Sequence, residues 1–288
     1  MAEKAKVVIT DYVWESLDVE KKILEGLADL VAFKTSKTEE FLREAQDCDA
    51  LLNTYAGPIT AEVMARMPKC KIIARYGIGV DTIDLDAATS AGIIVTNNPT
   101  YCIEEVAEHT MALLLACARK IVFYDRLVRG GRWEVSPGKP MFRLAGGTLG
   151  LVGFGNIARQ VAVRAGAFGM QVLFSDPYVS KGQFNAPGKK VELPELLQAS
   201  DFVSIHPPLT PQTRKMIDSD ALSRMKPTAF LINCARGPIV DTDALVRALD
   251  AKDDRRLRPR HRRSRTAAQS APAARAGKRH HRSPRGLV

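Results

Sequence analysis

The sequence predicts an α/β fold in which parallel sheets are covered by helices on both faces. Short apolar runs of strand type alternate with segments of helix length through most of residues 6–250, and this alternation is typical of parallel sheets. The chain has 288 residues, of which 45% are hydrophobic, so it is long enough for two cores. We expect two domains, with a boundary near Asn98 and Pro99, where one alternating set ends and a long helix begins.

Each expected strand is a short apolar run bounded by turn or polar residues. A charged segment with helical spacing follows the first run, through Lys21 to Leu30. The strongest helix covers residues 104–131 and ends in Gly130 and Gly131, which suit a helix C-cap. The expected strands are residues 6–10, 50–54, 71–77, 92–97, 149–155, 171–176, 201–206 and 229–235.

The formal net charge of +10 comes from the C-terminal tail. Residues 251–288 contain 13 Lys and Arg against two Asp, so residues 1–250 contain 29 basic residues against 30 acidic ones. The tail has few aliphatic residues and no periodicity, and we expect it to be disordered. A tail that binds nucleic acid through phosphate contacts is a rival interpretation, but the tail lacks the interleaved aromatic residues that would support it.

The rest of the composition indicates a cytoplasmic protein without a metal site. The longest apolar segment, residues 111–118, is far shorter than the roughly 20 residues that cross a bilayer, and the N-terminus lacks a signal-peptide pattern. The cysteines are scattered, with no paired spacing and no histidine cluster nearby, so they predict neither a disulfide framework nor a zinc site. They are Cys48, Cys70, Cys102, Cys117 and Cys234.

A glycine-rich turn at residues 148–158 predicts a dinucleotide site. Gly153 and Gly155 follow an apolar strand and allow a sharp turn with close approach to a pyrophosphate, and Ala158 takes the third small position. A second glycine pair, in residues 75–84, lacks that third small residue. A glycine turn in an α/β domain without a ligand is the alternative interpretation.

The segments after this turn complete the dinucleotide pattern. The helix that begins near Asn156 offers free N–H groups to phosphates. Asp176 ends the next strand, 23 residues after Gly153. A carboxylate there accepts a hydrogen bond from a ribose 2′-OH and repels a 2′-phosphate, which favours NAD over NADP.

With these motifs, the chain resembles the D-isomer-specific 2-hydroxyacid dehydrogenases over about residues 6–250. The resemblance rests on RYGIGVDTIDLDAATSAGIIVTNNP, VAEHTMALLLA, TLGLVGFGNIA, HPPLTPQT and MKPTAFLINCARGPIVDTDAL. The stretch YCIEEVAEH is similar to phosphoglycerate dehydrogenases, glyoxylate/hydroxypyruvate reductases and C-terminal-binding-protein corepressors alike. The resemblance implies two doubly wound parallel-sheet domains: a flavodoxin-like substrate domain at residues 1–98 and a Rossmann NAD-binding domain at residues 99–252, with the active site in the cleft between them.

The resemblance also implies the site residues. Arg236 falls on the catalytic arginine, whose guanidinium can bind the carboxylate of a 2-keto acid and polarise its carbonyl. Arg75 and Gly77 fall on the site for the substrate carboxylate. A solvated arginine and ordinary strand-end packing are the alternative interpretations. The implied cofactor contacts are Ile78, Gly153, Gly155, Asn156, Ile157, Asp176, His206, Pro207, Cys234 and Ala235.

The acid/base histidine of the family and its partner glutamate have no match in this chain. The only histidines before the tail, His109 and His206, lie elsewhere in the pattern. Where the family continues with a strand of the form IAGxAxDV, this chain has the arginine run of residues 255–266. Translation from one base later, starting at Asp253, permits Thr-Ile-Ala-Gly-Phe-Ala-Leu-Asp-Thr, which resembles the missing strand. We therefore interpret residues 253–288 as an out-of-frame translation.

The resemblance predicts an NAD-dependent oxidoreductase that transfers a hydride between nicotinamide and a small D-2-hydroxy acid or 2-keto acid. A homodimer is expected on the same ground, and neither a membrane nor a nucleic acid is an expected partner. Catalysis should be impaired in the chain as written, because it lacks the proton-transfer pair. The alternative is an NAD(H)-sensing binding protein of corepressor type with little catalysis.

Overall fold

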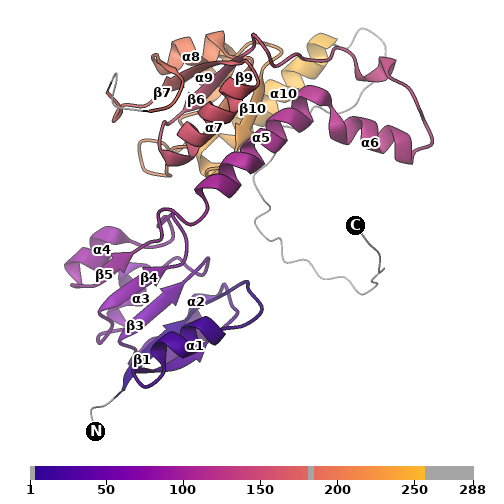
Figure 1. The fold of residues 1–288 in the computed structure, drawn as a ribbon. Helices are drawn as coiled ribbons and strands as arrows, with labels where there is room; N and C mark the ends of the chain where they lie inside the picture. Colours follow the sequence, from indigo (N-terminus) through magenta and orange to yellow (C-terminus); the bar gives the residue numbers. More distant parts are fainter. Residues whose placement is uncertain (1–3, 181–184, 257–288) are drawn as a thin grey trace. The chain divides into compact units, whose positions relative to one another are not determined.

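The computed structural model describes residues 4–180 and 185–256, and the side chains up to residue 250. The chain divides into two compact units, one ending at Cys102 and one beginning at Ile103 (Figure 1). The tail was expected to be disordered from residue 253, which is wrong for its first residues, because a helix that begins at Thr242 continues to Arg256. The rest of the expected tail, residues 257–288, lies outside the described residues. Within the described part, no helix combines the length and the apolar composition needed to cross a bilayer.

The first unit is a five-stranded parallel sheet with the order β2-β1-β3-β4-β5, which is the flavodoxin-like order. Its core contains Val8, Phe41, Leu51, Ile59 and Ile73, all fully buried. The strands are β1 (Ala5–Ile9), β2 (Ala28–Ala32), β3 (Ala50–Asn53), β4 (Ile72–Arg75) and β5 (Ile94–Thr96). The helices are α1 (Asp18–Leu24), α2 (Thr38–Ala45), α3 (Ala61–Ala65) and α4 (Leu85–Ser90).

The second unit is also a five-stranded parallel sheet, with the order β10-β9-β6-β7-β8. Counted from its first strand, this is the 3-2-1-4-5 order of dinucleotide-binding sheets. The strands are β6 (Thr148–Val152), β7 (Gln171–Ser175), β8 (Lys189–Lys190), β9 (Phe202–Ile205) and β10 (Phe230–Asn233). The helices are α5 (Ile103–Arg119), α6 (Ile121–Arg129), α7 (Asn156–Ala167), α8 (Leu193–Ala199), α9 (Ser219–Arg224) and α10 (Thr242–Arg256), with 3₁₀ turns η1 (Ser136–Gly138) and η2 (Gly237–Ile239).

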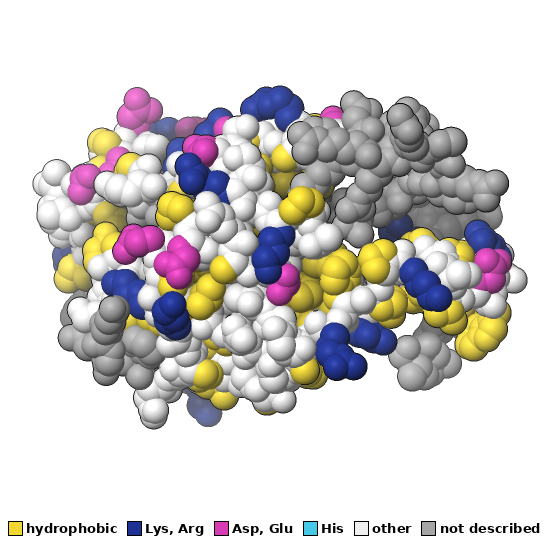
Figure 2. All heavy atoms as spheres, turned by 90° about the horizontal axis from the view of Figure 1, so that it is seen from above, with side chains coloured by type: hydrophobic (Ala, Val, Ile, Leu, Met, Phe, Trp, Pro, Cys, Tyr) yellow, Lys and Arg dark blue, Asp and Glu magenta, His cyan; other side chains and the backbone are white. Residues whose placement is uncertain are grey.

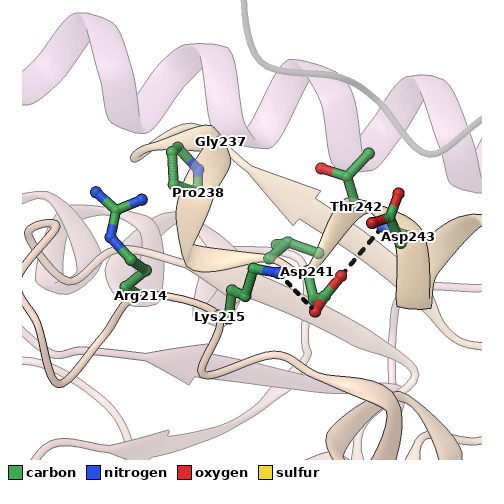
Figure 3. A pocket seen from close by; sticks show the side chains of 8 residues that line it. Arg214, Lys215, Gly237, Pro238, Asp241, Thr242 and Asp243 are labelled. Carbon is green, nitrogen blue, oxygen red and sulfur yellow. Dashed lines mark hydrogen bonds and ion pairs between the residues drawn. The ribbon is translucent and has the colours of Figure 1, made fainter.

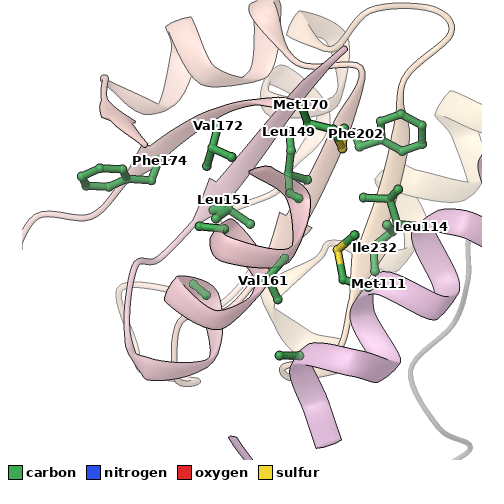
Figure 4. Close-up of a cluster of buried hydrophobic side chains, with 14 of the residues drawn as sticks. Met111, Leu114, Leu149, Leu151, Val161, Met170, Val172, Phe174, Phe202 and Ile232 are labelled. Atoms are coloured by element: carbon green, nitrogen blue, oxygen red, sulfur yellow. The ribbon is translucent and has the colours of Figure 1, made fainter. Parts of the chain in front are cut away.

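Helices cover both faces of the second sheet, which confirms the predicted doubly wound class. On one face, Met111 and Leu114 of α5 and Val161 of α7 pack against Leu149 and Ile232 of the strands (Figure 4). On the other face, side chains of α8, α9 and α10 form a second cluster with the strands. Burial of apolar side chains on both faces explains why β6, β7, β9 and β10 read as nearly continuous apolar runs.

Two sequence-based expectations about helices were wrong. The helix expected through Leu30 ends at Leu24, because Gly26 adopts φ +75° and turns the chain into β2, which pairs with β1. The single helix expected over residues 104–131 is two helices, α5 and α6, separated at Lys120, whose φ of 55° is left-handed. Its expected end is confirmed, since Gly130 is the C-cap of α6.

Candidate functional site

Four strands of the second unit end in register at one edge of the sheet. Val152 of β6 pairs with Ser175 of β7 and with Ile205 of β9, and Ile205 pairs with Asn233 of β10. The residues that follow these strands therefore lie along one row in the order Cys234, His206, Gly153 and Asp176. The strand order reverses at β6, because β7 and β8 lie on one side of it and β9 and β10 on the other. In parallel sheets, ligands bind outside the carboxyl ends of the strands at such a switch point. All four residues of the row were predicted cofactor contacts.

The turn after β6 requires glycine at its first position. Gly153 has φ +81°, and a Cβ there would lie 2.9 Å from the backbone nitrogen of Pro207. The turn therefore packs directly on the segment that follows β9. Gly155 is the N-cap of α7 without a side-chain capping bond, and a Cβ there would meet no atom within 4 Å.

The start of α7 can accept an anion. The first N–H groups of a helix have no partner within the helix, and they lie at the positive end of its dipole. In α7 these groups belong to Asn156 and Ile157, which were predicted cofactor contacts, and to Ala158, which is fully buried against the sheet. Open space at Gly155 beside a positive helix end fits a diphosphate.

The acidic residue at the end of β7 is held by the glycine turn. Asp176 Oδ2 accepts a hydrogen bond from the backbone N–H of Phe154 at 2.7 Å, and its Oδ1 accepts one from Tyr178 N–H at 2.8 Å. Arg159 donates from Nε to the carbonyl of Phe154 at 3.0 Å. The carboxylate is therefore oriented from two sides, and its remaining lone pairs are available to ribose hydroxyls.

The end of β9 contributes a neutral imidazole. His206 is partly buried, and its Nε2 lies 2.9 Å from the hydroxyl oxygen of Ser204. Desolvation by burial lowers the pKa of His206 to about 4. The side chain is therefore uncharged near neutral pH, and a general acid working at that pH would need a higher pKa.

The turn after β10 is clamped by a residue that sequence reasoning missed. Asn233 is buried; its Oδ1 accepts the N–H of Ala235 at 3.0 Å, and its Nδ2 donates to the carbonyl of Arg236 at 2.9 Å. The half-buried Arg236 donates from Nη1 to the carbonyl of Ala235 at 3.0 Å. A polar residue at the end of an apolar strand, three residues before an arginine, was the signal that could have identified Asn233.

The predicted substrate residues lie in the first unit, at the carboxyl end of β4. Arg75 is buried, and its Nε donates to the carbonyl of Gly79 at 2.7 Å. A Cβ on Gly77 would lie 3.5 Å from the guanidinium carbon of Arg75, so the two residues are neighbours. Ile78, the predicted nicotinamide contact, is partly buried in the same turn.

A second residue missed by sequence reasoning, Asp11, organises the loop after β3. Its carboxylate accepts the backbone N–H of Thr54 at 2.9 Å and that of Tyr55 at 2.6 Å. The carboxylate also accepts the hydroxyl of Thr10 at 2.7 Å. Asp11 lies two residues after the end of β1, and this position at the carboxyl end of a strand was the signal for it.

A shallow cavity of about 430 Å³ lies beside the turn after β10 (Figure 3). Lys215 and Asp241, which line it, form an ion pair at 3.2 Å. None of the predicted site residues lines this cavity. Among the described residues, no cluster of His, Cys, Asp and Glu could hold a metal ion.

Comparison with known proteins agrees with the dinucleotide-binding geometry. Residues 111–257 match the profile described as "D-isomer specific 2-hydroxyacid dehydrogenase, NAD binding domain". A glyoxylate reductase of Korarchaeum cryptofilum is 45% identical over 213 residues, 72% of this chain and 64% of that protein. A D-3-phosphoglycerate dehydrogenase of Methanocaldococcus jannaschii is 39% identical over 246 residues, 85% of this chain and 46% of that protein.

The solved structures lead to the same family. A D-lactate dehydrogenase of Aquifex aeolicus, complexed with NAD and lactic acid, has a TM-score of 0.80 and 33% identity over 85% of this chain and 74% of that one. The chain spans less than two thirds of the length of the first two relatives. The second unit is an NAD-binding domain of the type that its profile describes. The chain therefore belongs to the D-isomer-specific 2-hydroxyacid dehydrogenase family.

Proposed function

We propose that this protein is an NAD-dependent oxidoreductase that interconverts a small D-2-hydroxy acid and its 2-keto acid. The observation that carries the proposal is the row of strand ends that brings Gly153, Asp176 and the turn of Arg236 to one sheet edge. The names of the relatives, glyoxylate reductase and D-3-phosphoglycerate dehydrogenase, support this substrate class. Bound NAD would supply the hydride acceptor or donor.

The residues of the chain have distinct proposed roles in binding. The N–H groups at the start of α7 bind the diphosphate, and Asp176 binds the adenosine ribose. His206, Pro207, Cys234 and Ala235 form the wall of the cofactor site at the ends of β9 and β10. Ile78 approaches the nicotinamide.

The substrate is a carboxylate beside a carbonyl, and three groups are proposed to bind it. The guanidinium of Arg236 polarises the carbonyl and stabilises the negative charge that develops on its oxygen. Arg75 and the backbone at Gly77 bind the carboxylate. Residues 1–98 are the proposed substrate domain and residues 99–252 the proposed cofactor domain.

We propose in addition that residues from about 253 are read out of frame and that catalysis is therefore impaired. The match to the NAD-binding profile ends at residue 257, within the arginine run that begins at Arg255. A positioned acid/base group contributes about 10²- to 10⁴-fold to rate, and the shifted reading frame permits a histidine codon at Ser283. Sequencing the gene across codon 253 in independent isolates tests the proposal, since an unbroken frame encoding RRLRPRH would contradict it.

A cytoplasmic homodimer is the proposed form of the protein. The helix proposed to form the dimer contact is α6, along which Figure 2 shows hydrophobic side chains at the surface. Ile121, Val122 and Val128 are each about half exposed, and no side chain of this helix is buried within the described chain. A second copy that covers this helix would bury those side chains. Sedimentation of the wild type beside I121D would detect the loss of a dimer.

The experiment that tests the function measures NADH oxidation with glyoxylate, hydroxypyruvate and phosphohydroxypyruvate. It compares the 288-residue chain with the frame-restored protein, in which residues from 253 are read one base later. We expect turnover of at least one keto acid by the frame-restored protein, and a rate lower by at least 10²-fold for the 288-residue chain. NADH binding by both proteins without turnover by either would favour the corepressor-type alternative.

A further inference from the structure

Two cysteines of the first unit lie just before neighbouring strands, each two residues ahead of its strand. Ala50 of β3 pairs with Ile72 of β4, and Lys71 N–H donates to the carbonyl of Asp49 at 2.9 Å. Cys48 and Cys70 each lie two residues before this pair, so the parallel alignment places them opposite each other. Neighbouring strands are about 4.8 Å apart, which lies within the Cα–Cα range of about 4.4 to 6.8 Å found for disulfides.

Both thiols face the same core. Cys48 is fully buried, Cys70 is 6% exposed, and both pack in the cluster that contains Met67 and Leu51. Cys70 Sγ also lies 3.5 Å from the carbonyl of Ile72. Cysteines 22 positions apart in sequence are thus adjacent in space, and this is why their spacing gave no signal in the sequence.

We propose that Cys48 and Cys70 form a reversible disulfide when the protein meets a low-molecular-weight disulfide such as oxidised glutathione. This modification is independent of the proposed enzymatic function. It joins the amino ends of β3 and β4, whereas the predicted substrate residue Arg75 lies at the opposite, carboxyl end of β4.

The exchange proceeds in two steps that balance. Cys70 has the remaining exposure, so its thiolate attacks one sulfur of the small disulfide; that S–S bond breaks and one small thiolate leaves. Cys48 then loses its proton and attacks the Cys70 sulfur of the mixed disulfide, and the second small thiolate leaves. Two protein thiols are oxidised, one disulfide is reduced to two thiols, and the two protons end on the released thiolates.

The electrostatics of the pair favour this order of attack. A hydrogen bond from Cys48 lowers the pKa of Cys70, against the opposing effect of burial. The same hydrogen bond, with burial, raises the pKa of Cys48. The more readily ionised thiol is therefore also the more exposed one.

The test uses the full chain, reduced and then equilibrated without oxygen at graded ratios of reduced to oxidised glutathione. After acid quenching and unfolding, N-ethylmaleimide labels the remaining thiols, mass spectrometry counts them, and digestion without reduction identifies linked peptides. We expect the wild type to lose two thiols together and to yield one linked peptide that joins Cys48 to Cys70. The first thermal unfolding transition should rise by about 5 °C on oxidation, with NADH affinity unchanged.

Three variants make the result decisive. The triple variant C102A/C117A/C234A keeps only the proposed pair and should oxidise at the same glutathione ratio as the wild type. C48A should stop at a glutathione adduct on Cys70. Retention of both thiols in the triple variant under fully oxidised glutathione would overturn the proposal, as would linkage of either cysteine to another residue in the wild type. The thiol count and the linked peptide do not depend on cofactor binding or turnover.

Discussion

The carboxylate of Asp176, at the end of β7, accepts a hydrogen bond from the backbone N–H of Phe154, in the turn after β6, at 2.7 Å. This bond connects two strand ends that come from different parts of the sequence. It fixes the direction of the acidic side chain relative to the start of α7, where the diphosphate is proposed to bind. The residue proposed to select the cofactor and the turn proposed to bind the phosphates are therefore connected through one backbone group.

Replacement of Asp176 by serine should shift the cofactor preference. The change removes the negative charge that repels a 2′-phosphate and one acceptor for the ribose 2′-OH, so NADH should bind about tenfold more weakly and NADPH relatively better. Fluorescence titration with each reduced cofactor gives the two dissociation constants. An unchanged ratio of the two constants in D176S would show that Asp176 does not face the ribose.

The two glycines of the turn should respond differently to alanine. G153A places a Cβ 2.9 Å from Pro207 N at a left-handed φ, so it should lower the free energy of unfolding by about 1–2 kcal/mol and also weaken NADH binding. G155A meets no protein atom within 4 Å, so its stability should remain within about 0.5 kcal/mol of the wild type. Urea unfolding measures both values.

G155A is also the sharper binding test of the pair. Its Cβ would enter the space proposed for the diphosphate, and NADH affinity should fall at least tenfold while stability is retained. Wild-type affinity in a stable G155A protein would place the diphosphate elsewhere.

His206 should make the stability of the second unit depend on pH. Its folded pKa of about 4 lies below the ordinary value of 6.5, so between these values the unfolded chain binds a proton that the folded chain does not. The free energy of unfolding is therefore unaffected by this group above pH 6.5. As the pH falls from 6.5 to 4, the free energy of unfolding decreases by up to about 3 kcal/mol. Unfolding by urea at intervals across this range measures it.

The matched variants are H206Q and H109Q, since His109 is an exposed histidine on α5. H206Q should lose less stability on acidification than the wild type, and H109Q should follow the wild type. Parallel curves for the wild type and H206Q would show that His206 is solvated rather than buried.

Arg236 should affect turnover without affecting cofactor binding. In the frame-restored protein, R236K keeps the positive charge but loses the planar pair of donors, so kcat/KM for a keto acid should fall by about 10²-fold. NADH affinity should stay within twofold. R224A is the control, because Arg224 is an exposed arginine paired with Asp220 at 2.7 Å. Equal losses of kcat/KM in R236K and R224A would show that Arg236 does not act in the active site.

Eight of the ten strands that the structure describes, all except β2 and β8, could be predicted from the sequence because each is a short apolar run. Gly153 and Asp176 were predicted from the glycine-turn pattern, whereas Cys234 and His206 were predicted from the family resemblance. The four residues form one row because the carboxyl ends of parallel strands share one edge of the sheet. The fold class and the family were predicted from the same residues.

The errors arose where tertiary structure overrides local pattern. Leucine and valine in β2 fit a helix as well as a strand, and only pairing with β1 selects the strand. Lys120 interrupts an apolar helical pattern through its own backbone conformation. The adjacency of Cys48 and Cys70 depends on the register between β3 and β4, and Asn233 acts through bonds to its own turn. None of these relationships is encoded in residue spacing.

Isothermal titration calorimetry with NADH, applied to both the 288-residue chain and the frame-restored protein, tests whether the turn at Gly153 and Gly155 binds the cofactor. We expect saturable binding with one NADH for each chain, weakened in G155A and shifted toward NADPH in D176S. Absence of any binding heat from both proteins, with NADH and with NAD⁺ alike, would contradict it.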